Sequence, residues 1–375
     1  MCADTLVRNC LEPAVEARID VTDLELANLE SSLKTLNIET YRARQIYHWI
    51  HRRGVTAFDG MTNLSRQLQN DLASRFKVST PVITERQTSS DGTIKFALQL
   101  TDDHQIESVF IPETPRKTFC LSTQVGCAMQ CTFCLTGKMG IIRNLSAGEI
   151  VGQVRVLTRE LDLFEQPFNI VLMGMGEPLH NYDNTMQALR MLTCSYGQAV
   201  PLRRITLSTV GVLPALKRLA SEPTMPNLAV SLHGTTEAQR NQLVPINRKY
   251  GLRELIAACQ SFPLKRRSRI TFEYVLIKNV NDSEDDARRL VKILSGMKAK
   301  VNVIPLNTAS GIPFERPSQE RINRFGKILA RHQLTVSVRK SRGHDIRAAC
   351  GQLMLENEQQ RPLQQPKGLI KGLNN

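Results

Sequence analysis

The strongest constraint on the fold is a regular alternation of apolar and amphipathic segments that starts near residue 118. Apolar segments predict strands at 118–122, 168–174, 204–210, 227–232, 269–277, 300–306 and 334–339. Amphipathic segments predict helices at 146–161, 183–194, 212–221, 236–243, 252–261, 283–297 and 318–332. Six β-then-α units in a row predict a parallel sheet with right-handed crossovers. A closed eight-unit barrel needs about 250 residues, so this α/β chain is expected to form an incomplete barrel with its functional residues at the carboxyl ends of the strands.

The segments before the barrel predict two smaller units. Residues 22–76 show helical spacing, and 93–100 and 105–111 alternate like two paired strands after a turn. The predicted organisation is an N-terminal helical domain (1–80), an antiparallel β extension (81–117), the barrel (118–355) and a flexible tail (356–375).

The charge balance points to a polyanionic partner. Lys and Arg number 49 and Asp and Glu number 35, a net charge of +14. Such an excess of positive charge attracts nucleic acid. The alternative is a soluble basic protein that has no nucleic-acid partner. Basic residues are frequent over 42–53 of the helical domain, where they would contact phosphate or form a solvated face. The chain has no apolar run of membrane-spanning length and no signal-peptide pattern, so a soluble cytosolic protein without a membrane partner is expected.

Cys127, Cys131 and Cys134 form the sharpest local motif, a C-x-x-x-C-x-x-C loop after the first barrel strand. The chain has nine cysteines, an odd number that does not suit a disulfide framework. Three thiolates on one loop can converge on a metal centre, and they leave one position of a four-iron cluster open. The alternative is a zinc site with Cys120 as the fourth ligand.

The cysteine loop resembles the cluster loop of the radical S-adenosylmethionine (SAM) superfamily. Four further segments resemble the RlmN/Cfr family within it: 119–127, 173–178, 244–247 and 348–353. The resemblance covers roughly residues 22–355. It implies a partial (β/α)6 barrel that holds one 4Fe–4S cluster on Cys127, Cys131 and Cys134, with the open iron binding SAM.

The resemblance also implies a set of SAM contacts, most of which follow predicted strands. They are Gly176, Glu177, Ser208, Ser231, Leu232, His233 and Asn307. Taken singly, the glycine indicates a tight turn, Ser208 a turn residue and His233 a structural histidine.

Two cysteines outside the cluster loop and one glutamate receive catalytic roles from the resemblance. Cys350 would carry the methyl group, Cys120 would release the product by forming a disulfide with it, and Glu107 would accept a proton. From the residues alone, Cys350 would be an inert buried cysteine, or a thiol whose pKa is lowered by the positive charge nearby, from Arg339, Lys340, Arg342 and Arg347. Glu107 would face solvent. The other cysteines match no catalytic position: Cys2, Cys10, Cys194 and Cys259.

The implied reaction is methylation of adenosine at carbon 2, with two SAM molecules consumed per turnover. Its substrates would be an adenosine in the peptidyl-transferase region of 23S rRNA and the adenosine next to the anticodon of tRNA. A monomer and an external one-electron donor, such as flavodoxin or ferredoxin, are expected. The alternatives are a Cfr-type carbon-8 methyltransferase and a non-catalytic iron–sulfur or zinc RNA-binding protein.

Overall fold

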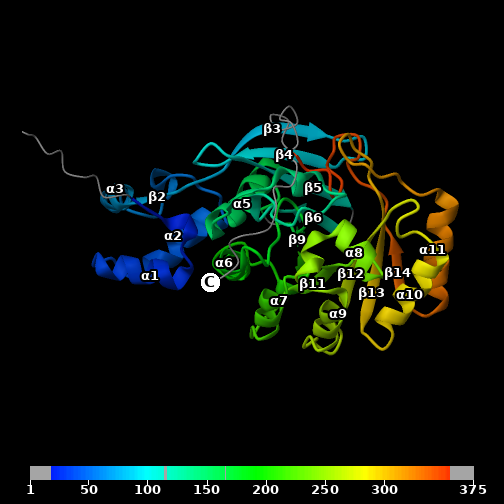
Figure 1. The fold of residues 1–375 in the computed structure, drawn as a ribbon. Helices are drawn as coiled ribbons and strands as arrows, with labels where there is room; N and C mark the ends of the chain where they lie inside the picture. Colours follow the sequence, from blue (N-terminus) through cyan, green and yellow to red (C-terminus); the bar gives the residue numbers. More distant parts are fainter. Residues whose placement is uncertain (1–17, 114–115, 165, 355–375) are drawn as a thin grey trace, which may run out of the picture.

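The computed structural model describes residues 18–113, 116–164 and 166–354 (Figure 1). Cys2 and Cys10 and the predicted tail 356–375 lie outside the described residues. No helix in the described part of the chain is both long and apolar enough to cross a membrane.

The N-terminal helices lie at one end of the molecule, coloured blue in Figure 1. They are α1 (Leu26–Thr35), α2 (Tyr41–His51) and α3 (Arg66–Arg75), with 3-10 turns η1 (Val21–Asp23) and η2 (Phe58–Gly60). Strands β1 (Ile19–Asp20) and β2 (Phe76–Lys77) pair in parallel. Leu29, Leu33 and Ile46 are among the side chains of a core separate from that of the barrel, as the helical spacing predicted.

Several contacts join this helical region to the barrel, and two of them involve acidic side chains. The backbone N–H of Gly148 donates to Asp23 Oδ1 at 2.6 Å, in the first turn of barrel helix α5 (Ala147–Glu160). Arg190, on barrel helix α6 (Tyr182–Thr193), pairs with Glu25 at 2.7 Å. The carboxylate of Asp23 is favourable at this helix start because the helix dipole is positive there.

One ten-stranded sheet runs through the rest of the molecule, in the order β14-β13-β12-β11-β10-β9-β6-β5-β4-β3. Its parallel strands are β6 (Arg116–Cys120), β9 (Asn169–Leu172), β10 (Ile205–Thr209), β11 (Asn227–Ser231), β12 (Ile270–Leu276), β13 (Ala299–Pro305) and β14 (Thr335–Val338). The remaining barrel helices are α7 (Leu213–Ala220), α8 (Glu237–Leu243), α9 (Leu252–Gln260), α10 (Glu284–Leu294) and α11 (Gln319–Arg331), and the short turns are η3 (Leu202–Arg204) and η4 (Pro245–Arg248). β14 and β3 are the two edges, so the sheet stays open and the predicted incomplete barrel is confirmed.

The antiparallel extension continues the barrel sheet instead of forming a separate one. It consists of β3 (Val82–Thr88), β4 (Ile94–Gln99) and β5 (Gln105–Glu113). β5 pairs antiparallel with β6, and this register places Val109 opposite Cys120. The extension therefore forms part of the wall beside the first barrel strand.

A hairpin of β7 (Gln124–Gly126) and β8 (Ile141–Asn144) frames the cysteine loop, which also contains α4 (Leu135–Met139). Gly126 has φ +77°, and a Cβ there would lie 2.0 Å from the Gly140 carbonyl oxygen. Only glycine fits this close approach of the two strands, so the residue before Cys127 determines how the loop leaves the hairpin.

Candidate active site

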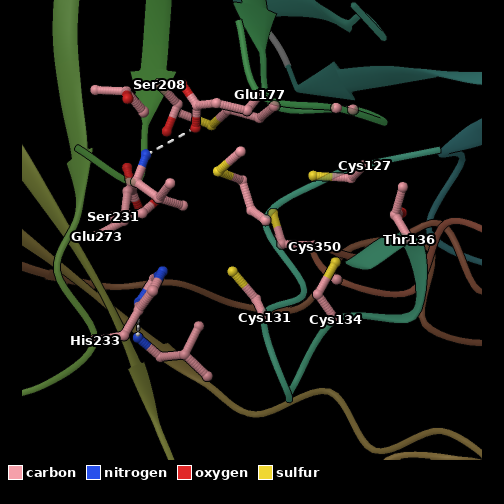
Figure 2. A pocket seen from close by; sticks show the side chains of 18 of the residues that line it. Cys127, Cys131, Cys134, Thr136, Glu177, Ser208, Ser231, His233, Glu273 and Cys350 are labelled. Atoms are coloured by element: carbon pink, nitrogen blue, oxygen red, sulfur yellow. Dashed lines mark hydrogen bonds between the residues drawn. The ribbon is translucent and has the colours of Figure 1, made fainter. Parts of the chain in front are cut away.

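A cavity at the carboxyl ends of the barrel strands brings together most of the predicted site residues. Cys127, Cys131, Cys134, Gly176, Glu177, Ser208, Ser231, His233 and Cys350 all line it. Figure 2 shows the cysteine loop on one side of the cavity and Ser208, Ser231 and His233 on the other. Ser208 lies near the end of β10, Ser231 ends β11, and His233 follows β11. The cavity therefore lies at the barrel end where the strand order predicted it.

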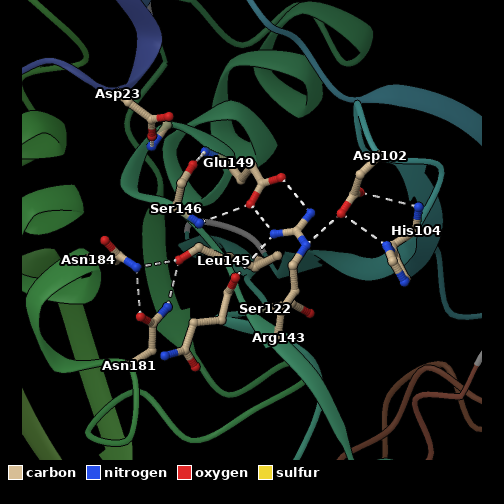
Figure 3. Close-up of polar contacts among 12 residues, drawn as sticks. Asp23, Asp102, His104, Ser122, Arg143, Leu145, Ser146, Glu149, Asn181 and Asn184 are labelled. Atoms are coloured by element: carbon tan, nitrogen blue, oxygen red, sulfur yellow. Dashed lines mark hydrogen bonds and ion pairs between the residues drawn. The ribbon is translucent and has the colours of Figure 1, made fainter. Parts of the chain in front are cut away.

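The cysteine loop is anchored by a polar network around Arg143 of β8 (Figure 3). Arg143 pairs with Glu149 of α5 at 2.7 Å and with Asp102 of the β4–β5 turn at 2.6 Å. The Asn181 amide donates to the backbone oxygens of Thr123 and Leu145, both at 2.8 Å. These contacts tie both strands of the hairpin to the barrel, which holds the loop that the hairpin carries.

The three cysteines of the loop fit an iron–sulfur cluster better than a single metal ion. Burial raises the pKa of all three thiols, to about 12 for Cys127 and well above the usual value for Cys131. Buried thiols ionise when a metal centre compensates the charge. No three His, Cys, Asp or Glu side chains among residues 18–113, 116–164 and 166–354 surround a position for one ion, as a zinc site would require. Cys120, the fourth ligand of the zinc alternative, does not line this cavity.

Glu177 bridges the loops that follow β9 and β10. Its carboxylate accepts hydrogen bonds from the backbone N–H groups of Leu179 at 3.0 Å and Val210 at 2.9 Å. Burial raises the Glu177 pKa to about 7, although these hydrogen bonds act in the opposite direction. Gly176 has φ +102°, and a Cβ there would lie 2.6 Å from the Gln124 side chain. The backbone before Glu177 therefore packs directly against the hairpin.

His233 is a neutral imidazole in the cavity wall. Burial, and secondarily the charge of Arg240, lower its pKa to about 3. Its Nδ1 accepts a hydrogen bond from Val275 N–H at 3.0 Å, so Nε2 carries the proton. The ring makes an edge contact with Phe133 of the cysteine loop, with centroids 4.8 Å apart. His233 thus has both a structural hydrogen bond and a place in the cavity.

Two predicted SAM contacts lie elsewhere. Leu232 is fully buried and does not line the cavity, although its neighbours Ser231 and His233 do. Asn307 lines an adjacent cavity, and its amide donates to the Cys350 carbonyl oxygen at 3.3 Å. In this structure Asn307 supports the segment that carries Cys350.

The adjacent cavity, called here the second cavity, contains the other two cysteines of interest. Cys350 borders both cavities, whereas Cys120 lines only the second. Both are free thiols. Burial, and secondarily the charge of Cys350, raise the Cys120 pKa to about 12. The structure therefore brings together two cysteines that are far apart in the sequence.

The expectation that basic neighbours lower the Cys350 pKa is wrong in this structure. Burial raises that pKa, while the charge and a side-chain hydrogen bond of Arg339 oppose the shift. Cys350 is an exposed residue that borders both cavities, but the protein around its thiol still removes enough water for desolvation to be the larger effect.

Glu107 does not face solvent, contrary to the expectation from a strand glutamate. Its side chain is 4% exposed and pairs with Lys95 at 2.9 Å across β4 and β5. Burial raises its pKa, and Lys95 acts in the opposite direction. Glu107 lines neither cavity, but it shares the strand face of Val109 and Ile111, which line the second cavity.

Two family models match separate parts of the chain. A model of the Radical SAM superfamily matches residues 121–291. A model described as ribosomal RNA large subunit methyltransferase N-terminal domain matches residues 19–78. The dual-specificity RNA methyltransferase RlmN of Geobacter sulfurreducens is 47% identical over 339 residues, which cover 90% of this chain and 93% of the relative.

The chain belongs to the RlmN family.

Another RlmN relative and a solved structure support this family assignment. RlmN of Zymomonas mobilis is 44% identical over 358 residues, 92% of this chain and 91% of its own. A crystal structure of a radical SAM methyltransferase from Sphaerobacter thermophilus has a TM-score of 0.86 at 46% identity and covers 89% of this chain and 99% of its own. The predicted family and α/β radical SAM fold are confirmed, and with them an enzyme that uses a 4Fe–4S cluster and SAM.

Two buried charges of this RlmN-family site were missed in the sequence analysis. Arg240 on α8 is fully buried and donates to the carbonyl oxygens of Leu232 at 3.1 Å and Ser231 at 3.3 Å. Glu273 on β12 lines the first cavity. For Glu273 the available signal was a charged residue within an apolar strand, which in a buried element needs a specific partner. The polar helix around Arg240 offered no such signal.

Proposed function

We propose that this chain is a radical SAM methyltransferase that methylates carbon 2 of adenosine in 23S rRNA and in tRNA. The observation that carries the proposal is the position of Cys350 between two cavities. One cavity contains the cluster-loop cysteines, and the other contains Cys120. A thiol that takes a methyl group on one side and delivers it on the other needs this placement.

The first cavity provides the residues that would hold the cofactors. Cys127, Cys131 and Cys134 would hold the cluster, and Gly176, Glu177, Ser208, Ser231 and His233 would contact SAM. When bound, these groups supply the methyl group and the one-electron chemistry, with two SAM molecules used per turnover. Leu232 and Asn307 would contribute through the backbone and through support of the Cys350 segment.

The second cavity provides the residues for delivery and release. After carbon–carbon bond formation, carbon 2 would lose its proton, and the unpaired electron of the adduct would return to the one-electron carrier of the enzyme. The methylene then bridges adenine carbon 2 and the Cys350 sulfur in a closed-shell adduct. The Cys120 thiolate attacks that sulfur, a disulfide forms, and the sulfur–carbon bond breaks with its electron pair on the carbon. Protonation of that carbon completes the methyl group, and an external dithiol reduces the disulfide.

Glu107 is proposed as the acceptor of the proton that leaves carbon 2. Burial raises its pKa, which favours uptake of a proton, and its strand face is shared with residues of the second cavity. Lys95 would stabilise the ionised carboxylate before the transfer.

The N-terminal helical domain (1–80) is proposed to supply RNA affinity, with the extension (81–117) and the barrel (118–355) forming the site. Arg44, Trp49, Arg53 and Tyr196 line a surface pocket where α2 meets the barrel, and a basic pocket with aromatic rings suits RNA. The protein would work as a cytoplasmic monomer with an external electron donor such as flavodoxin or ferredoxin.

Nucleoside mass mapping tests the proposal. Unmodified 23S rRNA and tRNA transcripts are incubated anaerobically with reconstituted enzyme, SAM and a reductant. We expect 2-methyladenosine in both digests. The carbon-8 isomer would favour the Cfr-type alternative, and SAM cleavage without RNA methylation would refute the proposal.

A further inference from the structure

Glu273 on β12 and Asn302 on β13 form a buried hydrogen-bonded pair. They are register partners in the sheet, and Asn302 Nδ2 donates to Glu273 Oε1 at 2.8 Å. The residues are 4% and 6% exposed. Glu273 Oε2 and Asn302 Oδ1 have no hydrogen-bond partner in the described part of the chain. Leaving a buried acceptor unpaired is costly, so these two oxygens require an explanation.

The pair lies in the wall between the two cavities. Glu273 lines the first cavity and Asn302 lines the second, which also contains Cys120 and Cys350. The other charged residues of the second cavity are mostly cationic: Lys300, Arg339, Lys340 and Arg342, with Glu113. A cavity with cationic walls and the two reactive thiols is where an RNA nucleotide would enter.

Hydrogen bonding determines how the Asn302 amide is turned. Because Nδ2 is engaged by Glu273, Oδ1 is the atom left to accept a hydrogen bond. Arg339 lines both cavities, hydrogen-bonds the Cys350 thiol, and interacts electrostatically with Glu273. The residues around the second cavity thus provide a thiol on Cys350, a donor on Arg339 and an acceptor on Asn302. Arg339 interacts with Cys350 and with Glu273, the residue that orients the Asn302 amide.

This set of groups complements one edge of adenine. Along that edge adenine has carbon 2, then the acceptor N1, then the exocyclic amine, which is a donor. We propose that Asn302, oriented by Glu273, is a specificity-determining residue that accepts a hydrogen bond from the exocyclic amine of the target adenine. Arg339 then donates to N1, and carbon 2 faces Cys350. This inference rests on the proposed function and adds how the base is selected.

The same arrangement rejects the opposite hydrogen-bonding pattern. Hypoxanthine, the base of inosine, keeps a hydrogen on carbon 2 but has a donor at N1 and an acceptor at carbon 6. Its donor would meet the Arg339 donor and its acceptor would meet Asn302 Oδ1. Enzymes that act on an extruded base read this edge by hydrogen bonds, and two mismatched contacts discriminate strongly.

The test uses three tRNAs assembled from synthetic pieces, with adenosine, purine riboside or inosine beside the anticodon. Purine riboside keeps carbon 2 and N1 but lacks the exocyclic amine. The measured quantity is the preference for adenosine over each analogue in kcat/KM for methylation at carbon 2. We expect Asn302→Leu to lower the preference over purine riboside by at least about ten-fold, since one buried hydrogen bond is lost.

A second variant tests the orientation of the amide. In Glu273→Gln the glutamine amide can donate to Asn302 Oδ1. The Asn302 amide can then turn so that Nδ2 faces the base, and the preference for adenosine over inosine should fall. The matched control is Asn323→Leu, at an exposed asparagine of α11. The control should keep both preferences of the unmodified protein. Each preference is a ratio within one preparation, so a smaller fraction of active enzyme does not change it.

The outcomes separate the inference from the proposed function. An unchanged preference over purine riboside in Asn302→Leu overturns the inference alone. Loss of RNA-independent SAM cleavage in Asn302→Leu would also overturn the inference, because Asn302 would then belong to the SAM site. If the unmodified protein does not methylate the adenosine tRNA, the proposed function and this inference both fail.

Discussion

Arg143 forms a bidentate ion pair with Glu149, with nitrogen–oxygen distances of 2.7 and 2.8 Å. The pair joins β8, the strand that follows the cysteine loop, to the first turn of α5. Glu149 also accepts a hydrogen bond from Ser146 N–H at 2.9 Å, which completes the N-terminal capping box of that helix. One carboxylate therefore stabilises both the helix start and the hairpin that carries the cluster loop.

Arg143→Met should lower the free energy of unfolding by about 1–2 kcal/mol, because charge-assisted bonds to Glu149 and Asp102 are lost from a partly buried site. Urea unfolding measures this change. Arg288→Met is the control, because Arg288 pairs with Glu284 and Asp285 on an exposed helix face. Its effect should stay below about 0.5 kcal/mol, and equal effects in the two variants would contradict the anchoring role.

Replacing Cys127, Cys131 or Cys134 singly by alanine should abolish both iron binding and SAM cleavage, since each thiol supplies one ligand to the cluster. Iron and sulfide are assayed in anaerobically reconstituted protein. Cys259→Ala is the control, because Cys259 is buried on α9 away from the cavities, and it should keep the full iron content. A loop variant with full iron content and intact SAM cleavage would refute the assignment.

Cys350→Ala and Cys120→Ala should fail at different steps. Cys350→Ala has no methyl carrier, so no RNA adduct forms and methylation is lost. Cys120→Ala can still attack adenine but cannot release it, so protein made in cells should carry covalently attached RNA. A denaturing gel should show a slow, nuclease-sensitive band that the double variant lacks. Normal turnover by Cys120→Ala, or an adduct in Cys350→Ala, would show that the roles are wrong.

Arg44→Ala with Arg53→Ala should weaken RNA binding and flatten its salt dependence. Each lost phosphate contact reduces the slope of log affinity against log salt by about 0.7–0.9. Filter binding of tRNA at several salt concentrations measures the slope, and RNA-independent SAM cleavage should be unchanged. Arg253→Ala, on α9 of the barrel, should leave the slope as it is. Identical slopes in all proteins would argue against RNA binding at the α2 pocket.

His51 should make the protein less stable in mild acid. Its side chain is buried beside Tyr47, with ring centroids 4.2 Å apart. Burial, and then the charge of Arg155, hold the His51 pKa well below its usual value. Below about pH 6.5 the unfolded chain therefore takes up a proton that the folded protein does not, and stability falls as pH falls.

Urea unfolding at pH 7.5 and pH 5.5 measures this contribution of His51. Between these two values the unmodified protein should lose about 1.4 kcal/mol more stability than His51→Leu, in which no side chain titrates at this position. His332→Gln, at an exposed histidine after α11, should behave like the unmodified protein. The same pH dependence in His51→Leu would mean that His51 is not the titrating group.

The sequence by itself determined the order of the barrel elements and the cluster ligands. A parallel sheet covered by helices makes each strand an apolar run and each helix an amphipathic one, as at Ile170–Leu172 and at α10. The three cluster cysteines lie on one short loop, so their convergence depends on local geometry. Both signals are short-range and can be recognised before the chain is folded.

Only the tertiary structure decided which distant residues meet and how far they are desolvated. Cys350 and Cys120 line the same cavity, and Glu107 is buried against Lys95. Asn307, expected among the SAM contacts, lines the second cavity and not the first. The tertiary structure also reversed the expected direction of the Cys350 pKa, because desolvation depends on everything packed around a group and not on its neighbours in the sequence. The unpaired oxygens of Glu273 and Asn302 appeared for the same reason: hydrogen-bond satisfaction is a property of the folded interior.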